Sequence, residues 1–224
     1  NCGVPVFKWC SLGVGTAYYD GGTMDVLVID NTEQNKLTKA EQDYVGTVSL
    51  AVGTKFLSLG MNVKYIQSTL VEKNVSKGVL YDTGILIQID TLRFGVAVQN
   101  IGDKIAYSNS NQTNIAPVNQ DAIPQTVRVG VALVAPFART NVFVLAGDAV
   151  FTAEDGQIRE NVGTELWFGK NIVLRAGYKI GYFDKTGAIS VGIGLNLNHF
   201  GFDYAAVDLG ELKYNHRVSV FVKL

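Results

Sequence analysis

The chain has 224 residues and a formal net charge of −1, with 47% hydrophobic and 17% charged residues. Because about a quarter of the residues of a soluble protein are charged, this composition indicates a large core or a second apolar surface. The near-zero charge and the lack of a long Lys or Arg run exclude a nucleic-acid-binding footprint. No stretch approaches the roughly 18 unbroken apolar residues of a membrane helix, so strands must make any membrane crossing.

The N-terminal segment begins Asn-Cys-Gly-Val-Pro and carries both cysteines, Cys2 and Cys10. Two thiols so close in sequence define neither a disulfide framework nor a metal site, and we interpret them as incidental small residues. The start lacks a basic end followed by an apolar core. We therefore expect that a signal peptide has been removed or that the chain begins inside a longer gene product. Residues 4–7 are predicted to be the tail of an earlier strand.

Residues 11–20 and 24–30 form either a hairpin around the glycines at 21 and 22 or one long strand kinked there. We favour the single strand because it keeps the alternation of sides along the chain. Beyond it, period-two alternation of apolar and polar or small residues predicts strands. These strands are expected at residues 44–52, 56–66, 79–90, 93–100, 126–134, 142–150, 161–169, 171–183, 188–198, 200–207 and 217–224.

Such a series of closely spaced strands predicts an antiparallel meander of about twelve full strands plus a stub. Single-chain bacterial barrels have an even number of strands, so we expect roughly two more N-terminal strands from outside this chain. The predicted fold class is therefore an all-β, antiparallel up-and-down transmembrane β-barrel of about fourteen strands. Residues 1–224 are predicted to form a single barrel domain.

Along these strands one face is apolar and the other holds charges and glycines, an alternation that a soluble sandwich would also show. We assign the apolar face to lipid, with Leu59, Val96, Val129, Leu166, Ile193 and Val220 as its representatives. We assign the other face to the lumen, with Lys64, Asp82, Arg93, Arg128, Asp148, Glu165, Arg175, Lys179, Asp203 and Arg217.

The connections favour the barrel, because outer-membrane barrels have short turns on the periplasmic side and longer loops outside. Short connections are predicted at residues 53–55, 90–91, 135–140, 169–171 and 198–199. Every second connection is longer and polar, and these are predicted at residues 31–43, 68–77, 101–125, 152–160 and 207–215, with 183–187 as the short exception. A soluble sandwich has no reason to sort its connections in this way.

Glu165 and Arg175 lie at equal distances from the turn at residues 169–171 and face the same side, so we expect a salt bridge across this hairpin. Charges in a narrow barrel are tolerated when they are paired, so we interpret the lumen charges as structural filling rather than substrate gating. His199 and His216 have no further ligand at metal spacing. No catalytic residue, metal site or cofactor is predicted, and we expect the protein not to be an enzyme.

The connection at residues 101–125 is the best functional candidate, since it is polar and longer than a connection needs to be. We expect it outside the cell, as a lid over the mouth or a contact for a partner, against the alternative of a loop with no role. Its candidate residues are Asp103, Lys104, Tyr107, Asn111, Pro117 and Pro124.

Several motifs resemble one known family. The segment LRAGYKIGYFDKTGAISVGIGL at residues 174–195, followed by residues 200–224, is similar to the C-terminal part of the PorV/PorQ family of FadL-like barrels. Upstream, LGMNVKYI, RFGVAVQNIG and NVGTELWF resemble the same family in order, so the match covers nearly the whole chain. The resemblance implies a fourteen-stranded barrel. The family's N-terminal Asn-Pro-Ala-Gly motif is absent, as expected if the N-terminal strands and plug segment are missing.

The resemblance implies a bacterial outer-membrane location and two roles. A PorV-like protein is a scaffold or shuttle partner in protein export of the type IX kind, and this is the role we favour. A FadL-like protein is a channel for hydrophobic small molecules. A third alternative is a structural barrel that assembles with itself or with another surface protein. The expected partners are outer-membrane lipid, a membrane protein and a hydrophobic ligand, without nucleic acid.

Overall fold

The computed structural model describes residues 2–28, 34–71, 74–106, 108–109, 120–154, 156–180, 188–197, 199–208, 210 and 213–222. Over these ranges, the regular elements are strands. Within the same ranges, none of the chain forms a helix long and apolar enough to cross a membrane.

A 14-stranded sheet contains most of the strands, and its neighbours follow the order of the chain. In sheet order they are β1 (Cys2–Phe7), β2 (Cys10–Asp20), β5 (Glu41–Gly53), β6 (Leu57–Leu70), β7 (Asn74–Ile89), β8 (Leu92–Gly102), β12 (Thr126–Pro136), β13 (Val142–Thr152), β14 (Ile158–Phe168), β15 (Ile172–Ile180), β16 (Ala188–Asn196), β17 (Phe200–Asp208) and β18 (Tyr214–Val222). The short β10 (Ser108–Asn109) pairs with β7. Two further pairs are β3 (Thr23–Val28) with β4 (Gln34–Lys39), and β9 (Lys104–Ala106) with β11 (Gln120–Ala122).

This order confirms the predicted antiparallel meander. Counted over the described residues, the main path holds twelve longer strands and the short β1, as the alternation predicts. The chain divides into two compact units. Unit 1 comprises residues 1–54, 58–84 and 98–125, and unit 2 comprises residues 55–57, 85–97 and 126–224. The single domain predicted for residues 1–224 stays a prediction.

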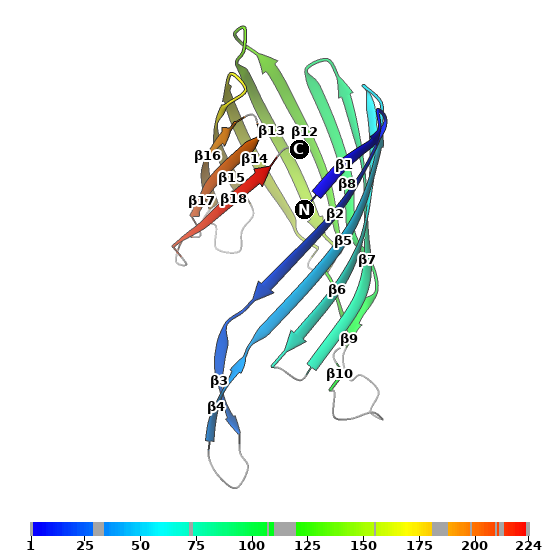
Figure 1. The fold of residues 1–224 in the computed structure, drawn as a ribbon, viewed down its shortest axis with the longest axis vertical. Coiled ribbons are helices and arrows are strands. Elements are labelled where there is room, and N and C mark those ends of the chain that lie inside the picture. Colours follow the sequence, from blue (N-terminus) through cyan, green and yellow to red (C-terminus); the bar gives the residue numbers. More distant parts are fainter. Residues whose placement is uncertain are drawn as a thin grey trace. The chain divides into compact units, whose positions relative to one another are not determined.

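In unit 1, one long hairpin runs from β2 and β3 into β4 and β5. Asp20 pairs with Gln42 at the end of β2, and Thr23 pairs with Lys39 at the start of β3. Between them, the Gly21 amide donates to the Glu41 carbonyl at 2.9 Å. Figure 1 shows β3 and β4 continuing from β2 and β5, so the prediction of one strand across the two glycines is confirmed.

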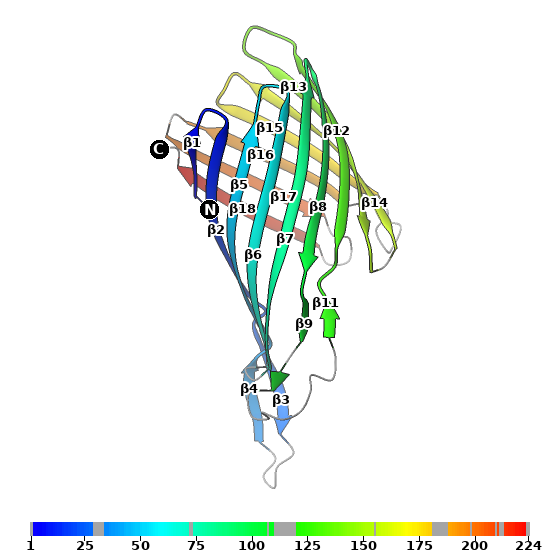
Figure 2. The same cartoon turned by 90° about the vertical axis from the view of Figure 1, so that its right-hand side faces the viewer.

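The same hairpin corrects the predicted connection at residues 31–43, because Gln34–Lys39 is strand β4. The predicted connections at 68–77 and 207–215 are also shorter, since β6 extends to Leu70 and β17 to Asp208. The polar residues of these segments indicated loops. The strands nevertheless extend beyond their apolar stretches, because they pair through backbone groups and polar side chains do not prevent this pairing. Figure 2 shows β2, β5, β6 and β7 side by side.

In unit 2, β12 to β18 pair in unbroken antiparallel registers. Leu174 pairs with Ile193, and its neighbour Arg175 pairs with Gly192, so apolar and polar or small residues occupy opposite faces of the sheet. Glycines and charges therefore share one face, and rows of Val, Leu and Ile share the other.

The apolar rows are exposed. Val129 is 52% exposed and Val48 is 58% exposed, whereas Leu80, Val173 and Ala188 are the buried hydrophobic residues within the described part of the chain. In water, contiguous apolar rows of this kind would be unstable, because soluble monomers rarely expose large apolar patches. No second sheet packs on these rows in the described residues, so the sandwich alternative is not supported.

Candidate functional site

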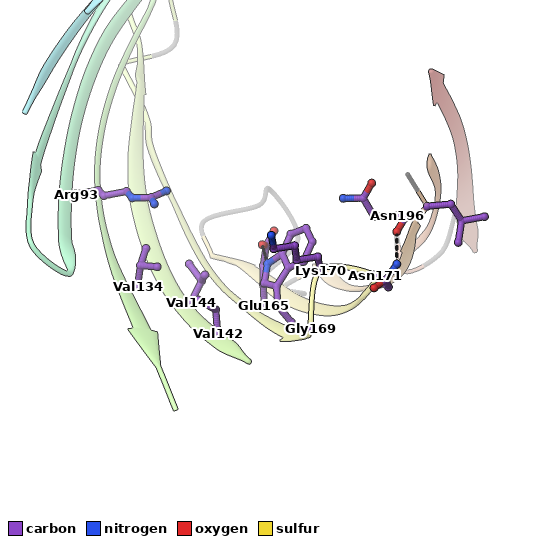
Figure 3. A pocket seen from close by; sticks show the side chains of 11 residues that line it. Arg93, Val134, Val142, Val144, Glu165, Gly169, Lys170, Asn171 and Asn196 are labelled. Carbon is purple, nitrogen blue, oxygen red and sulfur yellow. Dashed lines mark hydrogen bonds between the residues drawn. The ribbon is translucent and has the colours of Figure 1, made fainter. Parts of the chain in front are cut away.

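Unit 2 contains an open hollow of about 820 Å³ beside its short connections. One part of its wall is apolar and is formed by Val134, Val142, Val144, Trp167 and Leu197. The other part carries Arg93, Glu165, Gly169, Lys170, Asn171 and Asn196. Figure 3 shows the side chains of Arg93, from β8, and of Val134, Val142 and Val144, from β12 and β13, along this wall.

The turn between β14 and β15 shapes the lower wall of the hollow. Gly169 has φ +63°, a left-handed conformation that glycine adopts without strain. Its amide donates to Asn141 Oδ1 at 3.1 Å. Asn171 Nδ2 donates to the Asn196 carbonyl at 2.9 Å, the dashed line in Figure 3, and the Asn196 amide donates to the Asn171 carbonyl at 2.6 Å. Hydrogen bonds to neighbouring strands therefore hold the polar wall of the hollow at Gly169, Asn171 and Asn196 in place.

Arg175 organises the charges beside the hollow. Its Nε donates to Glu165 Oε1 at 3.0 Å, which confirms the predicted pair across the hairpin, and its Nη1 donates to Asp203 Oδ1 at 2.7 Å. Trp167 Nε1 donates to Glu165 Oε2 at 2.8 Å, and the guanidinium carbon lies 5.8 Å from the centroid of the Trp167 ring. This Arg175 cluster joins β14, β15 and β17.

Gly194, on the intervening strand β16, makes this reach possible. A Cβ at Gly194 would collide with Asp203 Oδ1 and would lie 2.6 Å from Val173 Cγ1 and 3.1 Å from Arg175 Nη1. The side chains of Arg175 and Asp203 therefore meet above Gly194, where any side chain would obstruct their contact.

Two cations of the hollow lack a counter-ion among the described residues. Arg93 and Lys170 are exposed and form no salt bridge or hydrogen bond with any residue in the described part of the chain. In contrast, Glu165 is fully engaged by Arg175 and Trp167. The hollow therefore combines an apolar wall, one aromatic ring and free positive charge.

Unit 1 contains a second charged group, the Lys64 cluster. Lys64 Nζ lies 2.7 Å from Asp82 Oδ1, and Asn62 Nδ2 donates to Asp82 Oδ2 at 3.2 Å. Asn100 has φ +60°; its amide donates to Asp82 Oδ1 at 3.0 Å and its Oδ1 accepts from Lys64 at 2.6 Å. Every charge in this cluster is therefore paired.

The Lys64 cluster is tied to the base of the connection at residues 101–125. Asn100 Nδ2 donates to the Pro124 carbonyl at 2.9 Å. Asp103 Oδ2 accepts from the Val79 amide at 3.2 Å, and Lys104 pairs with Ala122 at the start of β9. The other candidates of this connection, Tyr107, Asn111 and Pro117, lie outside the described residues.

The remaining residues predicted for the lumen are not gathered in one site. Asp148 Oδ1 accepts from Asn161 Nδ2 at 2.5 Å, and Asn161 is opposite Lys179 in the register. Arg128 is exposed opposite Val150, and Arg217 is exposed on β18 opposite Ala205. Of the residues predicted to face lipid, Leu59, Val96, Val129, Ile193 and Val220 are exposed, and Leu166 is half-buried.

Sequence reasoning missed Trp167 and Asn100. Trp167 has a signal in the sequence, because it lies two residues from Glu165 and so on the same strand face. Asn100 has a weaker one, since Asn tolerates the left-handed region and precedes Gly102 at a strand end.

No protein-family model matches the chain. No curated protein matches it either. Among solved structures, the chain is similar to the Pseudomonas putida toluene transporter TodX, at 10% identity and TM-score 0.61, with 96% of this chain and 78% of that chain covered. It is also similar to the CymD monoaromatic hydrocarbon channel, at 13% identity and TM-score 0.56, with the same coverage of 96% and 78%.

The fold is thus an antiparallel up-and-down transmembrane β-barrel, similar to the folds of these two proteins. Its exposed apolar rows need lipid around them, and barrels of this kind reside in the bacterial outer membrane, which is where this fold places the chain. Both solved neighbours are transport proteins rather than enzymes.

Proposed function

We propose that the chain is an outer-membrane channel for hydrophobic small molecules, and that the hollow of unit 2 is a station on their route. The observation that carries the proposal is the wall formed by Val134, Val142, Val144 and Trp167 on the charged face of the sheet. Contact with lipid does not explain apolar side chains on this face of the sheet. They offer an apolar solute a surface to bind. The similarity in fold to two hydrocarbon channels supports the same role.

The lumen assignment is part of this proposal. The face with Lys64, Asp82, Glu165, Arg175 and Asp203 surrounds the route, and the face with Val129, Ile193 and Val220 meets lipid. A carboxylate or guanidinium facing lipid would cost several kcal/mol, so the pairs Lys64–Asp82 and Arg175–Glu165 support this orientation of the sheet.

Tryptophan fluorescence offers a direct test. The chain has two tryptophans, so a Trp9→Phe variant leaves Trp167 as the reporter inside the hollow. We expect toluene to change its emission saturably in detergent or lipid. The matched Trp167→Phe variant reports from Trp9, which is stacked on Phe7 at 5.3 Å and is 58% exposed, and its response should be linear.

A pair of valine variants locates the binding surface. Val144→Ala removes apolar contact from the hollow and should weaken toluene binding several-fold, since each buried methylene contributes about 0.8 kcal/mol. Val131→Ala, on the opposite face and 47% exposed, should leave binding unchanged. A linear response from Trp167, or equal effects of the two valine variants, would contradict the proposal.

The PorV/PorQ-like export role is the second candidate and concerns the connection at residues 101–125. Its support is the order of the family motifs together with the anchoring of this connection by Asn100 and Asp103. A lid or partner contact would need such a fixed base. Affinity purification from native outer membranes tests it: recovery of a very large barrel partner favours export, and recovery of the chain with only its own copies favours self-assembly.

A further inference from the structure

The short connections of unit 2 place exposed aromatic rings beside basic side chains. Lys55 Nζ lies 5.9 Å from the centroid of the Phe56 ring, which is 63% exposed. Phe137, 53% exposed, is followed two residues later in the same connection by the exposed Arg139. Phe168 ends β14 two residues before Lys170. We call Lys55, Phe56, Phe137, Arg139, Phe168 and Lys170 the basic rim.

The cations of the basic rim are not neutralised within the described part of the chain. Lys55, Arg139 and Lys170 form no salt bridge with any residue in the described ranges. The connections at 54–56, 137–141 and 169–171 contain no Asp or Glu, and Asp90, between β7 and β8, is the acidic residue at this end of unit 2. Their positive charge is therefore available to an outside partner.

The opposite end of unit 2 does not share this basic excess. Among its described residues, the acidic Glu154 and Asp208 accompany the cation Lys213. The basic character is therefore a property of one end of the strands and not of unit 2 as a whole. A partner that distinguishes the two ends must carry negative charge.

The rings identify the kind of partner. Phe168 lies on the same face as the apolar row of β14 and is 41% exposed, so it continues the lipid-facing row to its end. Aromatic residues at that level mark the boundary between acyl chains and head groups, and Lys and Arg next to them extend into the head-group layer. Short connections face the periplasm, where the membrane leaflet is made of phospholipid.

We propose that the basic rim binds the phosphate groups of anionic phospholipids in the periplasmic leaflet. The rings fix the depth of the rim in the membrane. Lys55 and Arg139 lie where head-group phosphates are found, and Lys170 lies at the edge of the hollow. A Lys or Arg near an anionic leaflet gains enough binding energy to enrich the anionic lipid about fivefold.

Lipid competition tests the proposal. The chain in detergent is mixed with equal amounts of dioleoyl phosphatidylglycerol and dioleoyl phosphatidylcholine, and native mass spectrometry counts the lipids retained. We expect the wild type to prefer phosphatidylglycerol by about fivefold or more. The double variant Lys55→Gln, Arg139→Gln should lose this preference, and both positions are exposed enough for folding to be unaffected.

The matched control removes two exposed cations from the other end of the strands, Lys77→Gln with Lys213→Gln, and should keep the preference. Inorganic phosphate in large excess should not displace the lipid, because a head group is held together with its acyl chains. Equal retention of the two lipids by the wild type, equal losses in both double variants, or displacement by inorganic phosphate would overturn the proposal.

Discussion

The Lys64 cluster of unit 1 and the Arg175 cluster of unit 2 use the same residue types in different ways. The side chains of Lys64 and Asp82 are 17% and 10% exposed, and the two asparagines around them complete the hydrogen bonding. Arg175, Glu165 and Asp203 are each about one third exposed, from 33% to 36%, and lie beside the hollow. A closed pair supports the wall, whereas a half-open cluster can also contact a solute.

The largest expected difference between the clusters concerns the loss of one carboxylate. Asp82→Ala leaves Lys64 buried without a counter-charge and should lower the unfolding free energy by about 3–5 kcal/mol. Asp203→Ala should cost only about 1–2 kcal/mol, because Arg175 keeps Glu165. Urea unfolding in lipid vesicles measures both. The double variant Lys64→Met, Asp82→Leu should recover much of the loss, and equal costs in the two clusters would remove the distinction.

The two units should respond alike to a charge on the lipid-facing side of their strands, although their charged clusters respond differently to a lost carboxylate. Val48→Arg in unit 1 and Val129→Arg in unit 2 should each cost about 2–4 kcal/mol near the middle of the membrane. Ser219→Asn, on the opposite face beside Asp203 in the register, should be milder. The same unfolding assay compares the three variants, and equal penalties on both faces would count against the lipid assignment.

Gly194→Ala tests how closely the Arg175 cluster depends on its bare neighbour. The new Cβ would displace Asp203 or Arg175, at a cost of about 1–3 kcal/mol. In a Trp9→Phe background the emission of Trp167 should shift as well. Gly60→Ala in unit 1 is the control, because a Cβ there meets nothing within 4 Å. A shift of similar size in both variants would show that the Arg175 cluster does not need the glycine.

The exposed pair Asp20–Lys39 should give the smallest effect on stability, and it serves as a reference for both clusters. It lies at the end of β2, outside the membrane-spanning part, with 2.9 Å between Lys39 Nζ and Asp20 Oδ2. The hydrogen bond from Lys39, aided by the Gly22 amide, lowers the pKa of Asp20 to about 2. Because the pKa of Asp20 is lower in the folded chain than in the unfolded chain, the pair stabilises the fold at pH values above the ordinary carboxyl pKa near 4. This stabilisation is lost as the pH falls through about 2.

A carboxyl-carbon NMR titration measures this pKa. Lys39→Gln should raise the pKa of Asp20 toward its ordinary value, and an unchanged titration would show that the lysine is not the cause.

The strands and the Glu165–Arg175 pair could be predicted because both depend on neighbours in sequence: period two sets the face, and a three-residue turn sets the register. The contact of Arg175 with Asp203 could not, since it crosses β16 and depends on Gly194 there. The strand β4 was missed for a different reason. Beyond the membrane a hairpin has no lipid face, so the alternation that reveals the other strands is not required.

The unbroken pairing across Gly21 and Gly22 has a practical consequence for engineering. Since Thr23 to Lys39 close a hairpin of their own on a register already set by β2 and β5, this segment can be exchanged as a cassette. An epitope tag or a reporter domain grafted between Gly22 and Ala40 would be displayed away from the bilayer without altering the pairing that β2 and β5 make within it.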